Sequence, residues 1–144
     1  MTAPRILVVP GGTAISAVAL ANASIHKLVE LYEERQADPN HPAPHTVVFL
    51  RDPALVPPAT LRGSAATPEQ AFPEEDYPGL ANQIKNDPHF FDGVDLVIST
   101  SGSSAGKPRL VGLSMDALMA SVKATELALG GPGRWILALP THHI

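Results

Sequence analysis

The sequence predicts an α/β protein. Short apolar runs rich in β-branched residues recur along the chain, as expected for buried strands. Stretches in which apolar residues return at helical spacing follow two of these runs, and glycine- and proline-rich sequences separate them. Strands that alternate with helices are typical of the α/β class.

The first unit, residues 1–50, is predicted to be a strand, a helix and a second strand. Residues 6–9 (ILVV) form an apolar run that Pro10-Gly11-Gly12 closes, which indicates a buried strand and a turn. Thr13 is a candidate cap for a helix over residues 14–36. Its apolar positions at helical spacing are Ile25, Leu28, Val29 and Tyr32. Residues 46–50 (TVVFL) are the second strand candidate.

The second unit, residues 51–92, is predicted to be a proline-rich connection with one short helix. Prolines interrupt it at positions 53, 57, 58, 68, 73 and 78. Because proline fixes φ and removes a backbone donor, we expect a surface loop from 51 to 78. Residues 79–86 are the candidate for the short helix.

The third unit, residues 93–144, contains the best strand candidate, residues 94–99 (VDLVIS). A polar loop follows, and residues 109–113 are then expected to be extended. Ser114 is the predicted N-cap of a further helix. Residues 135–139 are the last strand candidate.

The composition argues against several classes of function. The net charge of −4 and the lack of a basic stripe argue against nucleic-acid binding. The chain has no cysteine, so disulfide scaffolds and thiol nucleophiles are excluded. No apolar run is long enough for a signal peptide or a membrane helix, and we expect a soluble, cytoplasmic protein with no membrane partner.

The polar loop has the residue types that a triphosphate requires. Small residues let backbone N–H groups approach a phosphate, hydroxyls add donors, and cations add charge. The candidate phosphate-binding residues are Thr100, Ser101, Gly102, Ser103, Ser104, Gly106, Lys107 and Arg109.

The residue types of this loop allow two other interpretations. A Walker-type loop (GxxxxGK followed by Ser or Thr) does not fit, because three residues rather than four separate Gly102 from Gly106. Pro108 also replaces the hydroxyl residue that would bind magnesium, and no helix begins directly after Lys107. A flexible Ser/Gly turn between two strands is the other alternative, and composition alone leaves it open.

The loop resembles the signature of the adenylate-forming (acyl-CoA synthetase, AMP-binding) superfamily. Thr100-Ser101-Gly102-Ser103-Ser104 matches the start of that signature, and Gly106-Lys107-Pro108-Arg109 matches its end. Three departures occur: Ala105 is inserted, Ser104 stands for threonine, and Arg109 stands for the terminal lysine. The change from lysine to arginine keeps the charge but alters the donor geometry.

The order of elements after the loop extends this resemblance. The family's order continues with a helix, a strand and then Pro140-Thr141-His142-His143-Ile144. This part of the sequence is similar to that of bacterial o-succinylbenzoate–CoA ligases of menaquinone biosynthesis. His143 then matches the family histidine near the acyl and CoA pocket. The resemblance covers about residues 94–144 and implies the N-terminal portion of the adenylate-forming fold, an incomplete mixed sheet with flanking helices.

The resemblance implies an ATP-dependent acid–CoA ligase that joins a small carboxylate, most specifically o-succinylbenzoate, to CoA through an acyl-adenylate. ATP and Mg²⁺ would be required, with the magnesium ligand outside this chain. We expect the chain to be an N-terminal fragment that is inactive alone, with a missing C-terminal half or a second copy as its partner. A non-catalytic nucleotide-binding module and an oligomerising interaction fragment remain alternatives.

Overall fold

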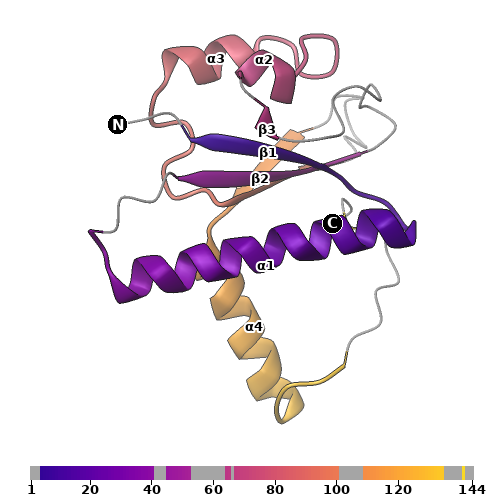
Figure 1. Cartoon of the computed structure of the whole chain (residues 1–144), viewed down its shortest axis with the longest axis vertical. Helices are drawn as coiled ribbons and strands as arrows, with labels where there is room; N and C mark the ends of the chain where they lie inside the picture. The colour runs from indigo at the N-terminus through magenta and orange to yellow at the C-terminus, as the bar shows by residue number, and fades with distance from the viewer. Residues whose placement is uncertain are drawn as a thin grey trace.

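The computed structural model describes residues 4–40, 45–52, 64–65, 67–100, 109–134 and 141. Within these ranges helices flank a mixed β-sheet, which confirms the predicted α/β class (Figure 1). The elements in chain order are β1 (Arg5–Pro10), α1 (Ile15–Ala37), β2 (Thr46–Arg51), β3 (Ser64–Ala65), α2 (Pro68–Ala71), α3 (Leu80–Asn86), β4 (Leu96–Thr100), β5 (Arg109–Leu113) and α4 (Met115–Leu129).

The described strands form one sheet in the order β3-β1-β2-β4-β5. The three central strands β1, β2 and β4 run parallel, with Val8 opposite Phe49 and Phe49 opposite Val97. The outer strands β3 and β5 are antiparallel to their neighbours. All six residues of β2 are buried, because this strand lies in the middle of the sheet and both of its faces are covered.

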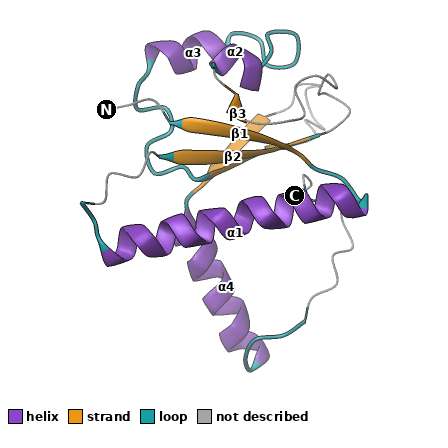
Figure 2. Cartoon of the chain, viewed as in Figure 1, coloured by secondary structure: helices purple, strands orange, loops and turns teal. Residues whose placement is uncertain are grey.

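Helices cover both faces of the sheet (Figure 2). On one face α1 and the start of α4 pack on alternate strand residues, and this core includes Val9, Ala21, Leu28, Leu96 and Met115. On the other face α2, α3 and the turns around them supply an aromatic core. Its buried members include Phe49, Phe72, Tyr77 and Phe91, and the rings of Phe49 and Phe72 stack with their centroids 4.9 Å apart.

The segment after β2 differs from the sequence prediction. We expected an irregular surface loop up to residue 78, but the described part from residue 67 onward contains α2, and Phe72 and Tyr77 are buried. Proline does stop the helices here from growing long, yet it does not keep their aromatic neighbours out of the core. The short helix predicted over residues 79–86 is confirmed as α3.

The two long helices begin differently. Ser114 is the N-cap of α4 as predicted, and its Oγ accepts a hydrogen bond from the Ala117 N–H at 3.1 Å. Thr13 is not the N-cap of α1, since that position is occupied by Ala14, which makes no side-chain cap bond. α4 then extends away from the sheet beyond α1 (Figure 1), and its apolar residues Val122 and Leu129 are exposed.

Candidate functional site

The candidate site lies at the carboxyl edge of the parallel strands. β1, β2 and β4 end there with Pro10, Arg51 and Thr100, because parallel strands share one direction. In open α/β sheets, ligands bind outside this edge. The predicted phosphate loop follows directly on Thr100, so its first anchor is at the edge where such a site is expected.

The loop connects two paired strand ends. Thr100 is opposite Arg109 in the antiparallel ladder of β4 and β5, and the Arg109 N–H donates to Thr100 Oγ1 at 3.3 Å. The Thr100 hydroxyl accepts this bond and keeps its own hydrogen to donate. The Arg109 side chain is exposed, and it has no ion-pair partner among the described residues. Two of the predicted phosphate-binding residues are therefore adjacent. One of them, Arg109, is a cation with no ion-pair partner among the described residues.

The other predicted site residues lie outside the described ranges. They are Ser101, Gly102, Ser103, Ser104, Gly106, Lys107 and His143, and the predicted strand over residues 135–139 also lies outside. Their roles stay predictions.

A second turn at this edge binds the end of the chain. The Gly12 N–H donates to Thr141 Oγ1 at 3.2 Å, and the Thr141 N–H donates to the Gly12 carbonyl at 3.4 Å. Gly12 has φ +143°, a conformation that side chains rarely adopt, so glycine suits this turn. Thr141 belongs to the Pro-Thr-His-His sequence that the resemblance places near the site, and it lies at the same sheet edge as the loop anchors.

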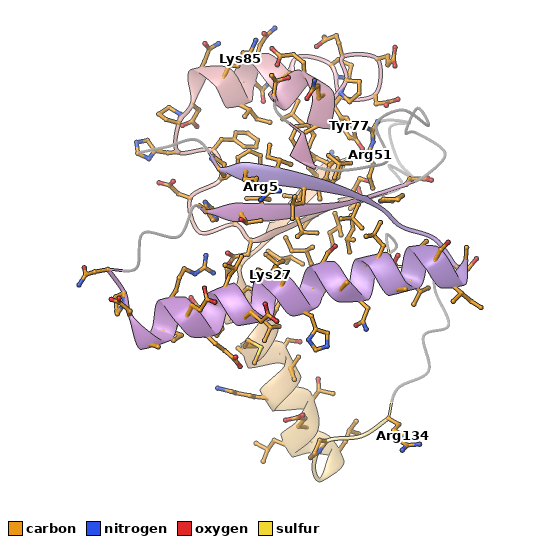
Figure 3. All side chains as sticks on the ribbon, in the orientation of Figure 1. Arg5, Lys27, Arg51, Tyr77, Lys85 and Arg134 are labelled. Carbon is orange, nitrogen blue, oxygen red and sulfur yellow. The ribbon has the colours of Figure 1, made fainter. Side chains whose placement is uncertain are left out.

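A buried arginine at the end of β2 is the site feature that the sequence did not predict. Arg51 is fully buried and pairs with Asp76, and its guanidinium carbon is 5.4 Å from the centre of the Tyr77 ring. Arg51 and Tyr77 lie together at one end of the sheet in Figure 3. A buried cation needs both a counter-charge and hydrogen bonds, and the 73–78 turn supplies the acid. This pair holds that turn against the carboxyl edge.

The phenol of Tyr77 is perturbed by this environment. Burial raises the pKa of Tyr77, because the ionised form loses hydration, and the nearby Ser99 and Arg51 partly oppose this effect. Ser99 precedes Thr100 in β4, so Tyr77 joins the Arg51 cluster to the strand that begins the loop.

A sequence signal for this cluster existed but was incomplete. Arg51 is a charged residue directly after a continuous apolar strand, which indicates a buried or edge position. Its partner Asp76 is 25 positions away, in the segment for which the sequence predicts a surface loop. Sequence spacing alone could not pair them.

A second polar cluster lies at the opposite, amino edge of the sheet. Asp95 is buried, accepts from Arg35 Nη2 at 2.9 Å, and accepts from the Met115 N–H at 2.8 Å. His45 is only partly exposed, and its Nε2 lies 2.8 Å from the Val94 carbonyl oxygen. A cavity of about 590 Å³ adjoins these groups. Here the buried acid satisfies a helix N-terminus, so the cluster has a structural role.

Two further observations concern metal ions and membranes. In the part of the chain that the structure describes, no three His, Asp or Glu side chains gather in a way that could hold a metal ion. Within the same ranges, no helix has the length and apolar character needed to cross a membrane.

The chain is similar to two curated proteins of Mycobacterium tuberculosis, from strains CDC 1551 / Oshkosh and ATCC 25618 / H37Rv. Each is named "Probable 2-succinylbenzoate--CoA ligase", and each is 37% identical to the chain over 103 residues. The match covers 72% of this chain and 23% of each relative, so the chain spans about a quarter of their length. No protein-family model and no solved structure matches the chain. The similarity supports a relationship to CoA ligases.

Proposed function

We propose that this chain is the phosphate-binding part of an ATP-dependent acid–CoA ligase, with 2-succinylbenzoate, the acid of menaquinone biosynthesis, as its substrate. The observation that carries the proposal is the 37% identity to two relatives that bear this name. Two features of the chain are consistent with it: the Ser/Gly-rich loop has the expected residue types, and its anchors lie at the carboxyl edge of the sheet.

The proposed reaction has two steps. A carboxylate oxygen of the acid attacks the α-phosphorus of ATP, the bond to the bridging oxygen breaks, and pyrophosphate leaves. The CoA thiolate then attacks the acyl carbon and AMP leaves. In the first step negative charge builds up on the phosphate oxygens, and positioned cations and N–H donors stabilise it.

The proposed roles of the loop residues follow from this chemistry. Lys107 and Arg109 would neutralise the phosphate charge, while Ser101, Ser103 and Ser104 would donate hydrogen bonds. Mg²⁺ would add charge neutralisation through ligands outside this chain, and His143 would lie near the acyl and CoA pocket. On this proposal the chain acts with further ligase sequence and is inactive alone. A homo-oligomer remains a prediction.

The test is ATP binding by the full 144-residue chain. A Lys107→Ala/Arg109→Ala double variant should weaken ATP at least about tenfold, since each hydrogen bond to a charged group is worth roughly 1.5–3 kcal/mol. A Lys123→Ala/Arg134→Ala variant is the matched control, because it removes two positive charges from exposed positions elsewhere. Equal ATP affinity in the two variants would contradict the proposal.

A second experiment separates a ligase from a simple binding module. Pyrophosphate release is measured with 2-succinylbenzoate and ATP, with and without the remaining sequence of a ligase relative supplied as a second polypeptide. We expect release only when both polypeptides are present. ATP binding without any release in either case would favour the non-catalytic module.

A further inference from the structure

Arg51 joins two turns at the carboxyl edge of the sheet. Its carbonyl oxygen accepts a hydrogen bond from the Gly11 N–H at 2.8 Å, in the turn that follows β1. Its guanidinium pairs with Asp76 and lies against the Tyr77 ring, in the turn that precedes α3 (Figure 3). Arg51 is the last residue of the central strand β2 and is fully buried, so it links the two turns from inside the protein.

Two strand residues beside the loop anchors lie on the same face of the sheet as this cluster. Because alternate residues of a strand share a face, Ser99 of β4 is on the face that packs in the aromatic core. Leu110 is opposite Ser99 in the ladder and packs against the same core. Ser99 directly precedes the anchor Thr100, and Leu110 directly follows the anchor Arg109.

A cavity of about 460 Å³ adjoins both the turn and the strand ends. It is lined by Asp76 and Tyr77 from the turn and by Arg109 and Leu110 from β5. Burial raises the pKa of the Tyr77 phenol, and the nearby Ser99 partly opposes this effect. The turn that the ion pair holds is therefore next to the strand ends from which the loop leaves.

Stability alone does not explain why an arginine is buried here. Charges lose hydration on burial, and apolar residues of similar size often replace a buried ion pair without loss of stability. Such a pair does fix one geometry, because a guanidinium has five donors at set angles. Residues that support a functional site from behind the groups that contact the ligand work in this way.

We propose that Arg51 is a positioning residue for the phosphate loop. Through Asp76 and Tyr77 it sets the positions of the strand ends from which the loop leaves. The inference rests on the proposed function, in which this loop holds the phosphates of ATP. Arg51 acts from the core and does not touch the nucleotide, since it is fully buried. Hydrogen bonds weaken steeply when distances and angles change, so displaced anchors would weaken phosphate binding.

The test is an Arg51→Met/Asp76→Leu double variant of the full chain, which removes both charges together. It should melt close to the parent temperature, because no uncompensated charge is left in the core. Its affinity for ATP, measured by calorimetry, should fall at least about tenfold. A purely structural ion pair predicts full ATP affinity in a stable double variant, and that result would overturn the inference.

The matched control is Glu69→Leu/Lys85→Met. This variant removes another ion pair, between α2 and α3, and it also leaves the net charge of the chain unchanged. Both of its residues are about half exposed, and neither lines the cavity beside Arg109. ATP affinity should stay at the parent value. An equal loss of affinity in the two double variants would contradict a specific role for Arg51.

Arg51→Lys decides the question if the double variant does not fold. Lysine keeps a positive charge for Asp76, but it lacks the planar guanidinium that lies against the Tyr77 ring. ATP affinity should fall about threefold or more. In that case, full ATP affinity in a folded Arg51→Lys variant would overturn the inference.

Amide hydrogen exchange separates failure of this inference from failure of the proposed function. In the Arg51 variants, exchange at residues 99–100 and 109–110 should be at least about tenfold faster, while exchange at residues 112–113 of the same ladder stays unchanged. If the parent does not bind ATP, the proposed function fails, and these exchange rates alone decide the inference. If the parent binds ATP and the Arg51 variants bind it equally well, the proposed function stands and the inference is wrong.

Discussion

Each edge of the sheet contains an ion pair in which one partner is buried. The buried partner is a cation at the carboxyl edge and an acid at the amino edge. At the carboxyl edge the cation Arg51 is 0% exposed, and its acid Asp76 is 16% exposed. At the amino edge the acid Asp95 is 8% exposed, and its cation Arg35 is 37% exposed. Each edge therefore buries one charge and leaves the partner closer to water.

The two edges therefore differ in how the charges at each are used. Asp95 is satisfied by the backbone and by Arg35, because it accepts hydrogen bonds from the Met115 N–H at the start of α4 and from the Arg35 guanidinium. At the carboxyl edge the pair fixes a turn, while the exposed Arg109 has no ion-pair partner among the described residues.

Asp76→Ala should have the largest effect. It leaves the fully buried Arg51 without the acid that pairs with it, and such a loss lowers the free energy of unfolding by about 3–5 kcal/mol. Denaturant unfolding measures the loss, and Glu75→Ala is the control, since Glu75 is exposed on the same turn. A loss below about 1 kcal/mol would mean that Arg51 does not depend on this partner.

Asp95→Asn should have a smaller effect and lower the free energy of unfolding by about 1–3 kcal/mol. The amide keeps one acceptor for the Met115 N–H, and the released Arg35 can turn toward water because it is 37% exposed. In the same measurement, Arg35→Gln should lower the free energy of unfolding by less than Asp95→Asn does. If Arg35→Gln costs as much or more, the acid is not the dominant partner, and the comparison of the two edges breaks down.

Ser114→Ala should lower the free energy of unfolding by about 1 kcal/mol, since it removes the bond from the Ala117 N–H to the N-cap. Ser121→Ala is the control, because Ser121 is a solvent-exposed residue in the middle of the same helix. An equal response of the two variants would show that the amino edge does not depend on this cap.

Alkaline pH should slightly lower the free energy of unfolding, because Tyr77 at the carboxyl edge loses its proton. The folded pKa of Tyr77 is raised above 10.0 by burial, so the unfolded chain loses this proton first. Stability from the neutral phenol is present below pH 10.0 and is lost as pH rises through the folded pKa. A Tyr77→Phe change should therefore reduce the fall in unfolding free energy between about pH 9 and about pH 11.

This pH measurement requires a Tyr32→Phe background. The hydrogen bond to Asp116 raises the pKa of Tyr32 as well, and the chain has two tyrosines. Phenolate absorbance of that variant then reports Tyr77 alone. An ionisation at or below pH 10.0 would show that the ring is not buried as described.

Local patterns in the sequence were sufficient for most of the described elements. The strands at residues 5–10, 46–51 and 96–100 follow continuous apolar runs, because a central parallel strand is buried on both faces. The cap at Ser114 was also predictable, since it depends only on neighbouring residues.

Long-range pairing was decided only by the tertiary structure. Phe72 and Tyr77 entered the core despite the prolines around them, because packing against Phe49 outweighs the local preference for a surface loop. The Arg51–Asp76 pair also joins residues that are distant in sequence. By itself the sequence determined the α/β class and the chemical character of the loop, since both follow from local residue types. The tertiary structure decided which charges are buried and which remain free, because that depends on which segments meet at the edges of the sheet.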